Sequence, residues 1–376
     1  MHTISRRRFT KILGSGAAYA AFSPSIVVAR PSVERRMETS RLGTVVRLSS
    51  NENPRGPSPL ALRAMSDAFN LSWRYPDEHA DMLAEKVAKL HGVSTDQILL
   101  GNGSGEVLKL TATAFTNTQK KAIVADPTFE AVGRHATTAG AQVVKIRLTP
   151  DYRHDLSGMI AAANGAGLVY VCNPNNPTAS LTPKQEIRTF LSKLPRETKV
   201  LVDEAYHHYV ESADYESVIP LVKDYPNLIV ARTFSKIYGM AGLRCGYCVT
   251  QPENIRAMRT HQLWDNVNIM ALVAASASLD DQRHVEQGRS SNTTTKQLLY
   301  SGLDRLGYKY IPSHANFLMI DLRRGVRPVI DSLAQRNVHV GRVFPSLPNF
   351  MRVTIGTRPQ METFLTTFRD VMRDVS

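Results

Sequence analysis

Cysteine is scarce in this chain, which has only Cys172, Cys245 and Cys248 among its 376 residues. Three cysteines provide no disulfide framework. Cys245 and Cys248 have the spacing of a redox motif, but they lie in an apolar, strand-like run, where free cysteine behaves as a small hydrophobic residue. His207 and His208 are adjacent, so their side chains point to different faces of a strand or helix, and no cluster of His, Cys and carboxylate residues has metal-ligand spacing. We therefore predict no redox motif and no catalytic metal.

The amino terminus lacks an uninterrupted apolar run of membrane-spanning length. Residues 12–29 are weakly apolar and are broken by two glycines and a proline, whereas a spanning helix needs about 20 predominantly apolar residues. They follow the basic segment Ser5–Lys11 (SRRRFTK) and end in small residues at Ala29. This combination resembles a twin-arginine export signal. It predicts a signal peptide over residues 1–29, transient binding to the twin-arginine export machinery and a periplasmic location. The competing interpretation is a basic arm that binds nucleic acid. If the leader is not functional or not cleaved, the expected location is the cytoplasm.

Acidic residues are fewer than basic ones, 33 against 46, which gives a formal net charge of +13. Removal of residues 1–29 takes away four basic residues and no acidic one, leaving +9. The basic residues are interspersed rather than clustered in the stripe expected of a nucleic-acid binder, so we expect no nucleic-acid partner. A diffuse positive field instead attracts small anionic substrates such as amino acids and keto acids.

The most informative residue is Lys236, which ends the segment TFSK and is followed eight residues later by Arg244. Upstream, an apolar run ends at Asp203. A lysine amine forms a Schiff base with an aldehyde cofactor, and a buried carboxylate opposite a pyridine nitrogen keeps that nitrogen protonated. The hydroxyls of Thr233 and Ser235 and the guanidinium of Arg244 are groups that bind phosphate. Each residue alone fits a surface position or a helix cap equally well, but together they predict an enzyme that uses pyridoxal 5′-phosphate.

Two polar turns add to this constellation. The segment GNGSGE at residues 101–106 follows an apolar run and precedes a helical pattern, so its backbone amides can hold a phosphate at a helix N-terminus. The strand-like run VYVCN leads into PNNPT at residues 174–178, a rigid turn that can aim Asn176 into a cleft at the carboxyl end of a sheet.

The order of these motifs resembles that of the fold type I pyridoxal phosphate enzymes, and within them the class II aminotransferases similar to histidinol-phosphate aminotransferase. The resemblance extends from about Leu48 to about Arg358, through the segments SSNENPRGPSP, RYPD, GNGSGEVL, DPTFEAV, NPNNPT, VDEAYHHY, TFSKIYGMAGLRCGY, NFLMIDL and MRVTIGT. It implies the aspartate aminotransferase-like fold: an α/β protein whose large domain has a mostly parallel seven-stranded sheet covered by helices, beside a smaller α+β domain.

The resemblance also implies roles at the cofactor. Lys236 would attach the cofactor and shuttle the proton, Asp203 would hold the pyridinium, and Asn176 and Tyr206 would bond the phenolic oxygen of the ring. The phosphate would be held by the remaining cofactor-binding residues, which are Gly103, Ser104, Gly105, Thr233, Ser235, Arg244, and Tyr75 from a second subunit. That last contact implies a homodimer with sites at the subunit interface.

For the substrate, the resemblance implies that Arg352 binds a carboxylate and that Asn51 lies in a segment closing over the site. Two positions depart from the histidinol-phosphate pattern. Phe129 stands where the family often has a tyrosine stacked on the cofactor, so stacking is kept and a hydroxyl is lost. Arg55 stands where a tyrosine usually lines the substrate pocket. Arg55 and Arg342 are groups that can recognise an acidic or phosphorylated side chain, although both are equally compatible with surface positions.

The coarse pattern along the chain alternates apolar strand-like runs with helical segments, as expected of a mostly parallel sheet covered on both faces. We expect helical segments near 59–70, 79–91, 105–115, 256–263, 271–306 and 360–374. The predicted organisation is a signal peptide over 1–29, an amino-terminal arm over 30–58 that joins the small domain, a large cofactor-binding domain over 59–260 and a small domain over 261–376.

The predicted reaction is transamination in a ping-pong cycle between an amino acid, or an amino-alcohol phosphate, and a 2-oxo acid. Two alternatives stay open. A decarboxylase of the same fold uses the same cofactor, since the orientation of the substrate decides which bond is lost. A non-catalytic binding protein built on this fold is disfavoured by the joint presence of Lys236, Asp203 and Arg244.

Overall fold

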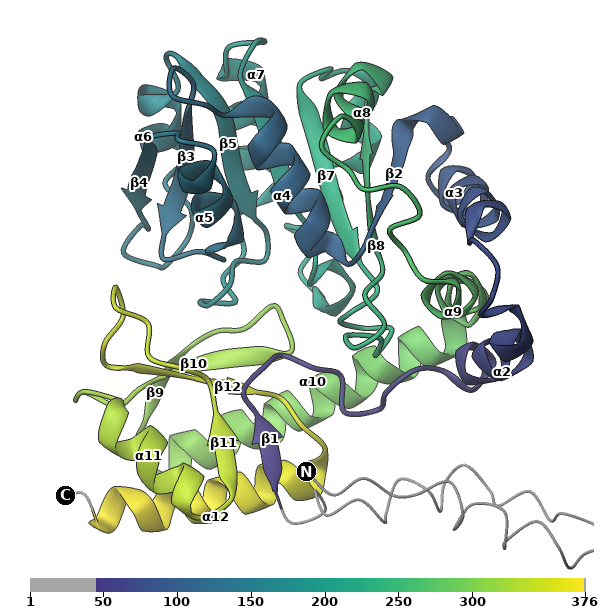
Figure 1. Ribbon diagram of the computed structural model, residues 1–376. Helices are drawn as coiled ribbons and strands as arrows, with labels where there is room; N and C mark the ends of the chain where they lie inside the picture. The colour runs from purple at the N-terminus through teal and green to yellow at the C-terminus, as the bar shows by residue number, and fades with distance from the viewer. Residues whose placement is uncertain (1–44, 375–376) are drawn as a thin grey trace, which may run out of the picture. The chain divides into compact units, whose positions relative to one another are not determined.

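The computed structural model describes residues 45–374. The predicted signal peptide and the first part of the predicted amino-terminal arm lie outside the described residues. Helices and strands alternate along most of the chain (Figure 1). No helix between residues 45 and 374 has the length and apolar character needed to cross a bilayer.

The large sheet has seven strands in the order β2-β8-β7-β6-β5-β3-β4. β8 runs antiparallel to both of its neighbours, and the other neighbouring pairs are parallel. In this order the strands are β2 (Ile98–Gly101), β8 (Gly246–Thr250), β7 (Leu228–Thr233), β6 (Lys199–Asp203), β5 (Ala166–Cys172), β3 (Lys121–Asp126) and β4 (Val143–Arg147). The mostly parallel seven-stranded sheet is therefore confirmed.

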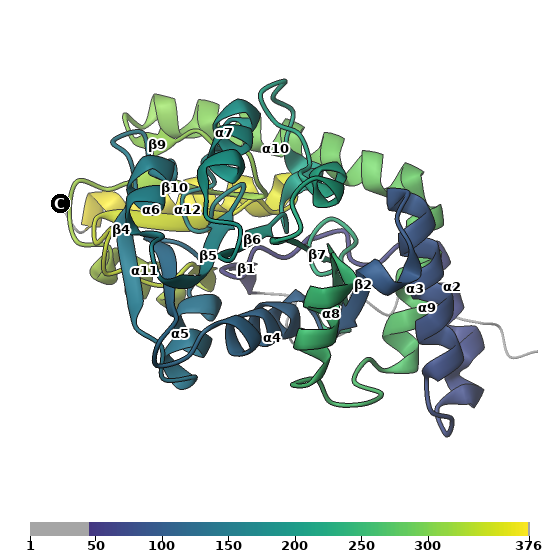
Figure 2. The ribbon, with the colours of Figure 1, turned by 90° about the horizontal axis from the view of Figure 1, so that it is seen from above.

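Helices cover both faces of this sheet. Figure 2 shows one layer made of α4 (Ser104–Phe115), α5 (Ala131–Thr138) and α8 (Pro252–Arg259), and an opposite layer with α6 (Leu156–Ala162) and α7 (Lys184–Lys193). Successive side chains of a strand point to opposite faces, and β5 follows this rule. Leu168 and Tyr170 join the core cluster of α4 and α8, whereas Val169 and Val171 join the cluster of α6 and α7. Burial on both faces explains why the central strands are continuous apolar runs.

A smaller α+β assembly follows the large sheet and is also confirmed. β12 (Phe350–Thr354), β10 (Phe317–Asp321) and β9 (Lys309–Ile311) form an antiparallel sheet. β1 (Val46–Leu48) pairs in parallel with β11 (Val338–Val340), so a segment of the amino-terminal arm lies against the carboxy-terminal part. The core of this assembly is shared with α10 (Gln282–Arg305), α11 (Arg327–Gln335) and α12 (Arg358–Asp374). The domain boundaries at residues 58 and 260 stay predictions.

Two predicted helical segments are wrong in their extent. The helix expected to contain residues 256–263 ends at Arg259, and turns follow until α9 (Ile269–Asp280) begins behind the cap formed by the Asn268 side chain. The helical run at 271–306 is two helices, because Asp281 ends α9 and its side chain caps α10 by accepting a hydrogen bond from the His284 backbone. α2 (Pro59–Ala68) and α3 (Asp77–His91) pack against α9, and α10 extends from there along the small assembly (Figure 1).

Candidate active site

A cavity of about 270 Å³ lies at the carboxyl ends of the parallel strands, the edge at which sheets of this type bind ligands. Asp203 and Thr233 are the last residues of β6 and β7, and Ser104 begins α4. The residues that line the cavity are Ser50, Asn51, Ser104, Gly105, Phe129, Cys172, Asn176, Asp203, Ala205, Tyr206, Thr233, Ser235, Lys236, Ala241, Arg244 and Arg352. The fold thus brings together most of the predicted site residues from segments far apart in the chain.

Lys236 is half-buried, and its amine points at the backbone of the amino-terminal arm. Nζ donates hydrogen bonds to the carbonyl oxygens of Ser50 at 3.3 Å and Asn51 at 3.1 Å. Burial and the nearby Arg352 guanidinium lower the pKa of Lys236 to about 8. A substantial fraction of the amine is therefore neutral near physiological pH, which is the form that attacks an aldehyde.

Asp203 is almost fully buried at the base of the cavity. Its carboxylate accepts hydrogen bonds from the Tyr170 hydroxyl at 3.0 Å and from the Ala205 backbone at 3.1 Å. Burial raises the pKa of Asp203 to about 6, while these hydrogen bonds and Lys236 act in the opposite direction. A buried carboxylate in this position would be stabilised by a cationic ring nitrogen, and would in turn keep that nitrogen protonated.

The N-terminus of α4 and Arg244 form a cradle that fits a phosphate group. The residue before this helix, Gly103, has a φ of 76°, and a Cβ there would overlap the Arg244 guanidinium. Arg244 Nη1 donates to Ala241 O at 2.8 Å and to Ser235 Oγ at 3.4 Å. A helix N-terminus combined with a guanidinium and a hydroxyl is a strong site for an anion.

Arg352 lies at another wall of the cavity, held by groups from both parts of the chain. Nη1 donates to Asn176 Oδ1 at 2.8 Å, and Nη2 donates to Ser49 O at 2.7 Å. Its buried Nε has no hydrogen-bond partner among residues 45–374. The side-chain amides of Asn51 and Asn176 both donate to the Tyr206 hydroxyl, at 3.1 Å and 3.5 Å. The arginine is therefore fixed in orientation at the wall of the cavity, and its Nε is buried beside Gly341.

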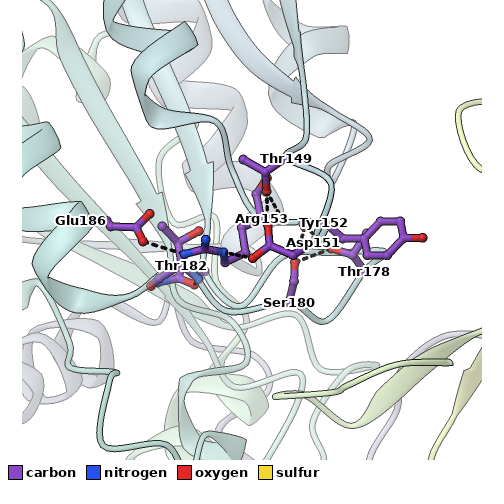
Figure 3. Close-up of polar contacts among 9 residues, drawn as sticks. Thr149, Asp151, Tyr152, Arg153, Thr178, Ser180, Thr182 and Glu186 are labelled. Carbon is purple, nitrogen blue, oxygen red and sulfur yellow. Dashed lines mark hydrogen bonds and ion pairs between the residues drawn. The ribbon is translucent and has the colours of Figure 1, made fainter.

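Asn176 is presented by a loop that a second turn supports from behind. Figure 3 shows this support, in which Ser180 Oγ donates to Tyr152 O at 2.6 Å. The same turn is anchored to α7 by the ion pair between Arg153 and Glu186 at 2.6 Å. All four residues belong to the large-sheet part of the chain, so the loop that carries Asn176 is braced within that part.

A buried ion pair next to the site was not foreseen from the sequence. Arg232 Nη2 lies 2.6 Å from Glu204 Oε2, and the two side chains are 7% and 1% exposed. Glu204 follows Asp203 in the chain, and Arg232 precedes Thr233. The pair therefore joins the ends of β6 and β7 at the residues that carry the site; a charged residue within the otherwise apolar β7 was the available signal.

Four of the residues considered from the sequence do not line the cavity, namely Gly103, Tyr75, Arg55 and Arg342. Gly103 directly precedes the lining residue Ser104. Tyr75, which is predicted to serve the site of a second subunit, is 79% exposed. Arg55 donates to Gln287 Oε1 on α10 at 2.8 Å. Arg342 forms an ion pair with Glu130 at 2.8 Å. Each of these two arginines thus has a side-chain partner among the described residues, and their recognition of an acidic or phosphorylated side chain stays a prediction.

The cavity carries the cationic groups of Lys236, Arg244 and Arg352 and the single lining carboxylate of Asp203. An excess of cations suits a cofactor and a substrate that are both anionic. Within residues 45–374, no group of three or more His, Cys, Asp or Glu side chains is arranged to hold a metal ion.

Comparisons with known proteins agree with this geometry. The family described as aminotransferase class I and II matches residues 43–368. A histidinol-phosphate aminotransferase from Moorella thermoacetica is 42% identical over 87% of this chain and 86% of its own length. One from Symbiobacterium thermophilum is 41% identical over 86% and 90%. A crystal structure of the Sinorhizobium meliloti histidinol-phosphate aminotransferase in complex with pyridoxal 5′-phosphate is 26% identical, with a TM-score of 0.84 over 96% of this chain and all of its own.

Proposed function

This chain belongs to the class I and II aminotransferases and transfers amino groups with pyridoxal 5′-phosphate, and we propose that the cavity around Lys236 is its reaction centre. The observation that carries the proposal is the convergence of Lys236, Asp203, Arg244 and Arg352 on one cavity. These are the groups needed for the aldehyde, the ring nitrogen, the phosphate and the substrate carboxylate.

When bound, the cofactor supplies an aldehyde that condenses with amines and a ring that takes up an electron pair. Lys236 would hold the aldehyde carbon of the cofactor between turnovers. Its free amine would accept the proton lost by the α-carbon of the donor and would later donate that proton back. A pKa of about 8 suits this double role, because the amine both accepts and donates a proton near neutral pH.

The other lining residues orient the cofactor. Asp203 would pair with the ring nitrogen, and Tyr206 and Asn176 would bond the phenolic oxygen. Phe129 would stack on the ring. Arg244 would hold the phosphate, together with Gly103, Ser104, Gly105, Thr233 and Ser235.

The guanidinium of Arg352, which lines the cavity, binds the substrate carboxylate, and Asn51 closes the cavity from the amino-terminal arm. An amino acid gives its amino group, leaves as a 2-oxo acid, and a second 2-oxo acid takes the group. The names of the relatives support histidinol phosphate as a second candidate donor. The decarboxylase hypothesis is less supported, because the family and these relatives are aminotransferases.

We further propose a homodimer in which Tyr75 reaches the phosphate of the partner's site. Several large apolar side chains are exposed on the α2–α3 segment and on the loop before α9: Phe69, Trp73, Tyr75, Met82, Leu263 and Trp264. α3 and α9 pack together, so these residues belong to one region (Figure 1). Grouped exposed apolar residues of this kind mark protein interfaces.

Export is proposed from the leader. The segment Ser5–Lys11 and the small residues ending at Ala29 support a cleaved twin-arginine signal and a periplasmic enzyme. Replacement of Arg6 and Arg7 by lysine should leave the full-length protein in the cytoplasm, as measured by cell fractionation. Periplasmic protein in that variant would contradict the proposal.

The reaction is tested by the visible absorption spectrum of the purified protein with pyridoxal 5′-phosphate. The band of the bound cofactor should be lost when an amino donor is added and should return with a 2-oxo acid. Donor-dependent release of carbon dioxide without this reversal would favour the decarboxylase. A Lys236→Ala variant that still turns over would contradict the assignment.

A further inference from the structure

We call the cavity around Lys236 the reaction cavity. A second cavity, of about 420 Å³, adjoins it at Phe129, and we call this one the lateral cavity. It is formed by β3, β4, α5 and the loop Phe344–Ser346. Phe129 lines both cavities, and its side chain is 42% exposed. The lateral cavity is therefore next to the place where the donor reacts.

The lateral cavity also adjoins the proposed carboxylate site. Phe344 lines it, and the Cζ atom of Arg352 lies 5.3 Å from the centre of the Phe344 ring. The Phe344 ring is thus close to the proposed carboxylate site, and the Phe129 ring lies where the two cavities meet. Aromatic walls of this kind stabilise apolar and aromatic groups.

The charged groups near the lateral cavity are already paired or solvated. Glu130 accepts from Arg134 at 2.6 Å and forms the ion pair with Arg342 at 2.8 Å. Burial acts to raise the pKa of Glu130, but these two guanidinium groups outweigh it and lower the pKa. Asp126 accepts a hydrogen bond from Ser346 at 2.7 Å, and Lys145 is exposed on β4. The main cationic group left to bind a phosphate is therefore the solvated Lys145. Val124, Val143 and Pro345 add apolar surface to the lining.

We propose that the lateral cavity receives the side chain of the amino donor, and that the donor is an α-amino acid with a large apolar side chain, such as phenylalanine, rather than histidinol phosphate. This inference rests on the proposed function of the reaction cavity. It assigns specificity to α5 and to the loop Phe344–Ser346, which the cofactor does not need.

Gly133 permits a test that leaves the reaction cavity untouched. It lies on α5 and lines the lateral cavity, and a Cβ there would meet only Val143 Cγ1, at an ordinary 3.7 Å. Leucine is a good helix former, so Gly133→Leu should fold and fill the cavity. Gly133→Ala is the matched control. The measurements are kcat/KM for phenylalanine, alanine and histidinol phosphate, and the dissociation constants of 3-phenylpropanoate and propanoate for the cofactor-loaded enzyme, by calorimetry.

We expect Gly133→Leu to lower kcat/KM for phenylalanine by about tenfold or more, the effect typical of a lost apolar pocket, and to weaken 3-phenylpropanoate similarly. Values for alanine and propanoate should stay unchanged, and Gly133→Ala should resemble the wild type. Equal losses for large and small ligands, no loss for phenylalanine, or a wild-type preference for histidinol phosphate would each overturn the inference. Failure of every donor to discharge the cofactor band of the wild type would instead refute the proposed function, and the inference with it.

Discussion

Arg352 donates a 2.8 Å hydrogen bond to the Asn176 side chain, and this contact joins the small antiparallel sheet to a loop of the large sheet. Both residues also line the reaction cavity. The proposed carboxylate site is therefore assembled across the two parts of the fold. A ligand bound by Arg352 would strengthen the contact between these parts.

Replacement of Arg352 by glutamine should raise KM for carboxylate-bearing donors. A hydrogen bond to a charged group contributes about 1.5–3 kcal/mol, so we expect an increase of roughly tenfold to a hundredfold. Arg352→Lys keeps the charge but loses the two-donor fork, and it should recover only part of the affinity. Steady-state kinetics with paired donors, with and without a carboxylate, measure the effect. An equal loss for both kinds of donor would contradict the carboxylate role.

Capture of the cofactor by the protein freed of it should depend on pH through Lys236. Burial and Arg352 lower the pKa of this lysine to about 8 from its ordinary 10.5, and only the neutral amine attacks. The capture rate should rise as pH increases through about 8 and level off above it. In Arg352→Gln the midpoint should move to higher pH, because the guanidinium lowers the pKa. Stopped-flow absorbance follows the rate, and a wild-type midpoint near 10.5 would refute the idea.

Gly103→Ala should weaken cofactor binding. The residue has a φ of 76°, and its Cβ would overlap the Arg244 guanidinium. A left-handed backbone costs a non-glycine residue about 1–2 kcal/mol, and the displaced arginine adds to this, so we expect roughly a tenfold loss or more. Gly325→Ala is the control, since its Cβ would meet nothing within 4 Å. Titration with pyridoxal 5′-phosphate measures the cofactor affinity of the two variants. Unchanged affinity in Gly103→Ala would argue against the phosphate cradle.

Breaking the buried pair of Glu204 and Arg232 should strongly destabilise the fold. Glu204 also accepts from the backbone of Val218 at 2.7 Å, so its loss leaves several donors without an acceptor. Removal of one partner of such a pair costs about 3–5 kcal/mol. We expect the free energy of unfolding to fall by this amount in Glu204→Leu or Arg232→Met, and by less in the double variant. Urea unfolding at a fixed cofactor concentration measures it. Additive losses in the double variant would show that the two residues act independently.

Mixing two inactive variants tests the proposed role of Tyr75 across the dimer. Lys236→Ala subunits retain Tyr75, and Tyr75→Ala subunits retain Lys236. If Tyr75 serves the partner's site, refolded mixtures contain hybrids with one complete site, and activity should exceed that of either variant alone. Size-exclusion chromatography establishes the dimer. If a dimeric mixture shows no gain in activity, Tyr75 acts in the site of its own subunit or in neither site.

The large sheet, its helical cover and most of the residues that line the reaction cavity could be predicted from the sequence. These features are encoded locally, because apolar runs predict buried strands and the presented residue lies at or shortly after a strand end. Asp203 is the last residue of β6, and Asn176 comes four residues after β5. Lys236 and Arg244 are eight residues apart, so one short segment carries both the amine and part of the phosphate site.

Local patterns do not show which polar groups already have partners or where cavities remain, because both depend on tertiary packing. Arg55 and Arg342 differ little from Arg352 as sequence positions, but the first bonds Gln287 and the second pairs with Glu130. The lateral cavity likewise combines Phe129 with Phe344, which are 215 positions apart by their numbering. Local patterns fix the backbone, whereas the pairing of charges and the shape of a cavity depend on side chains that only folding brings within a few ångströms of each other.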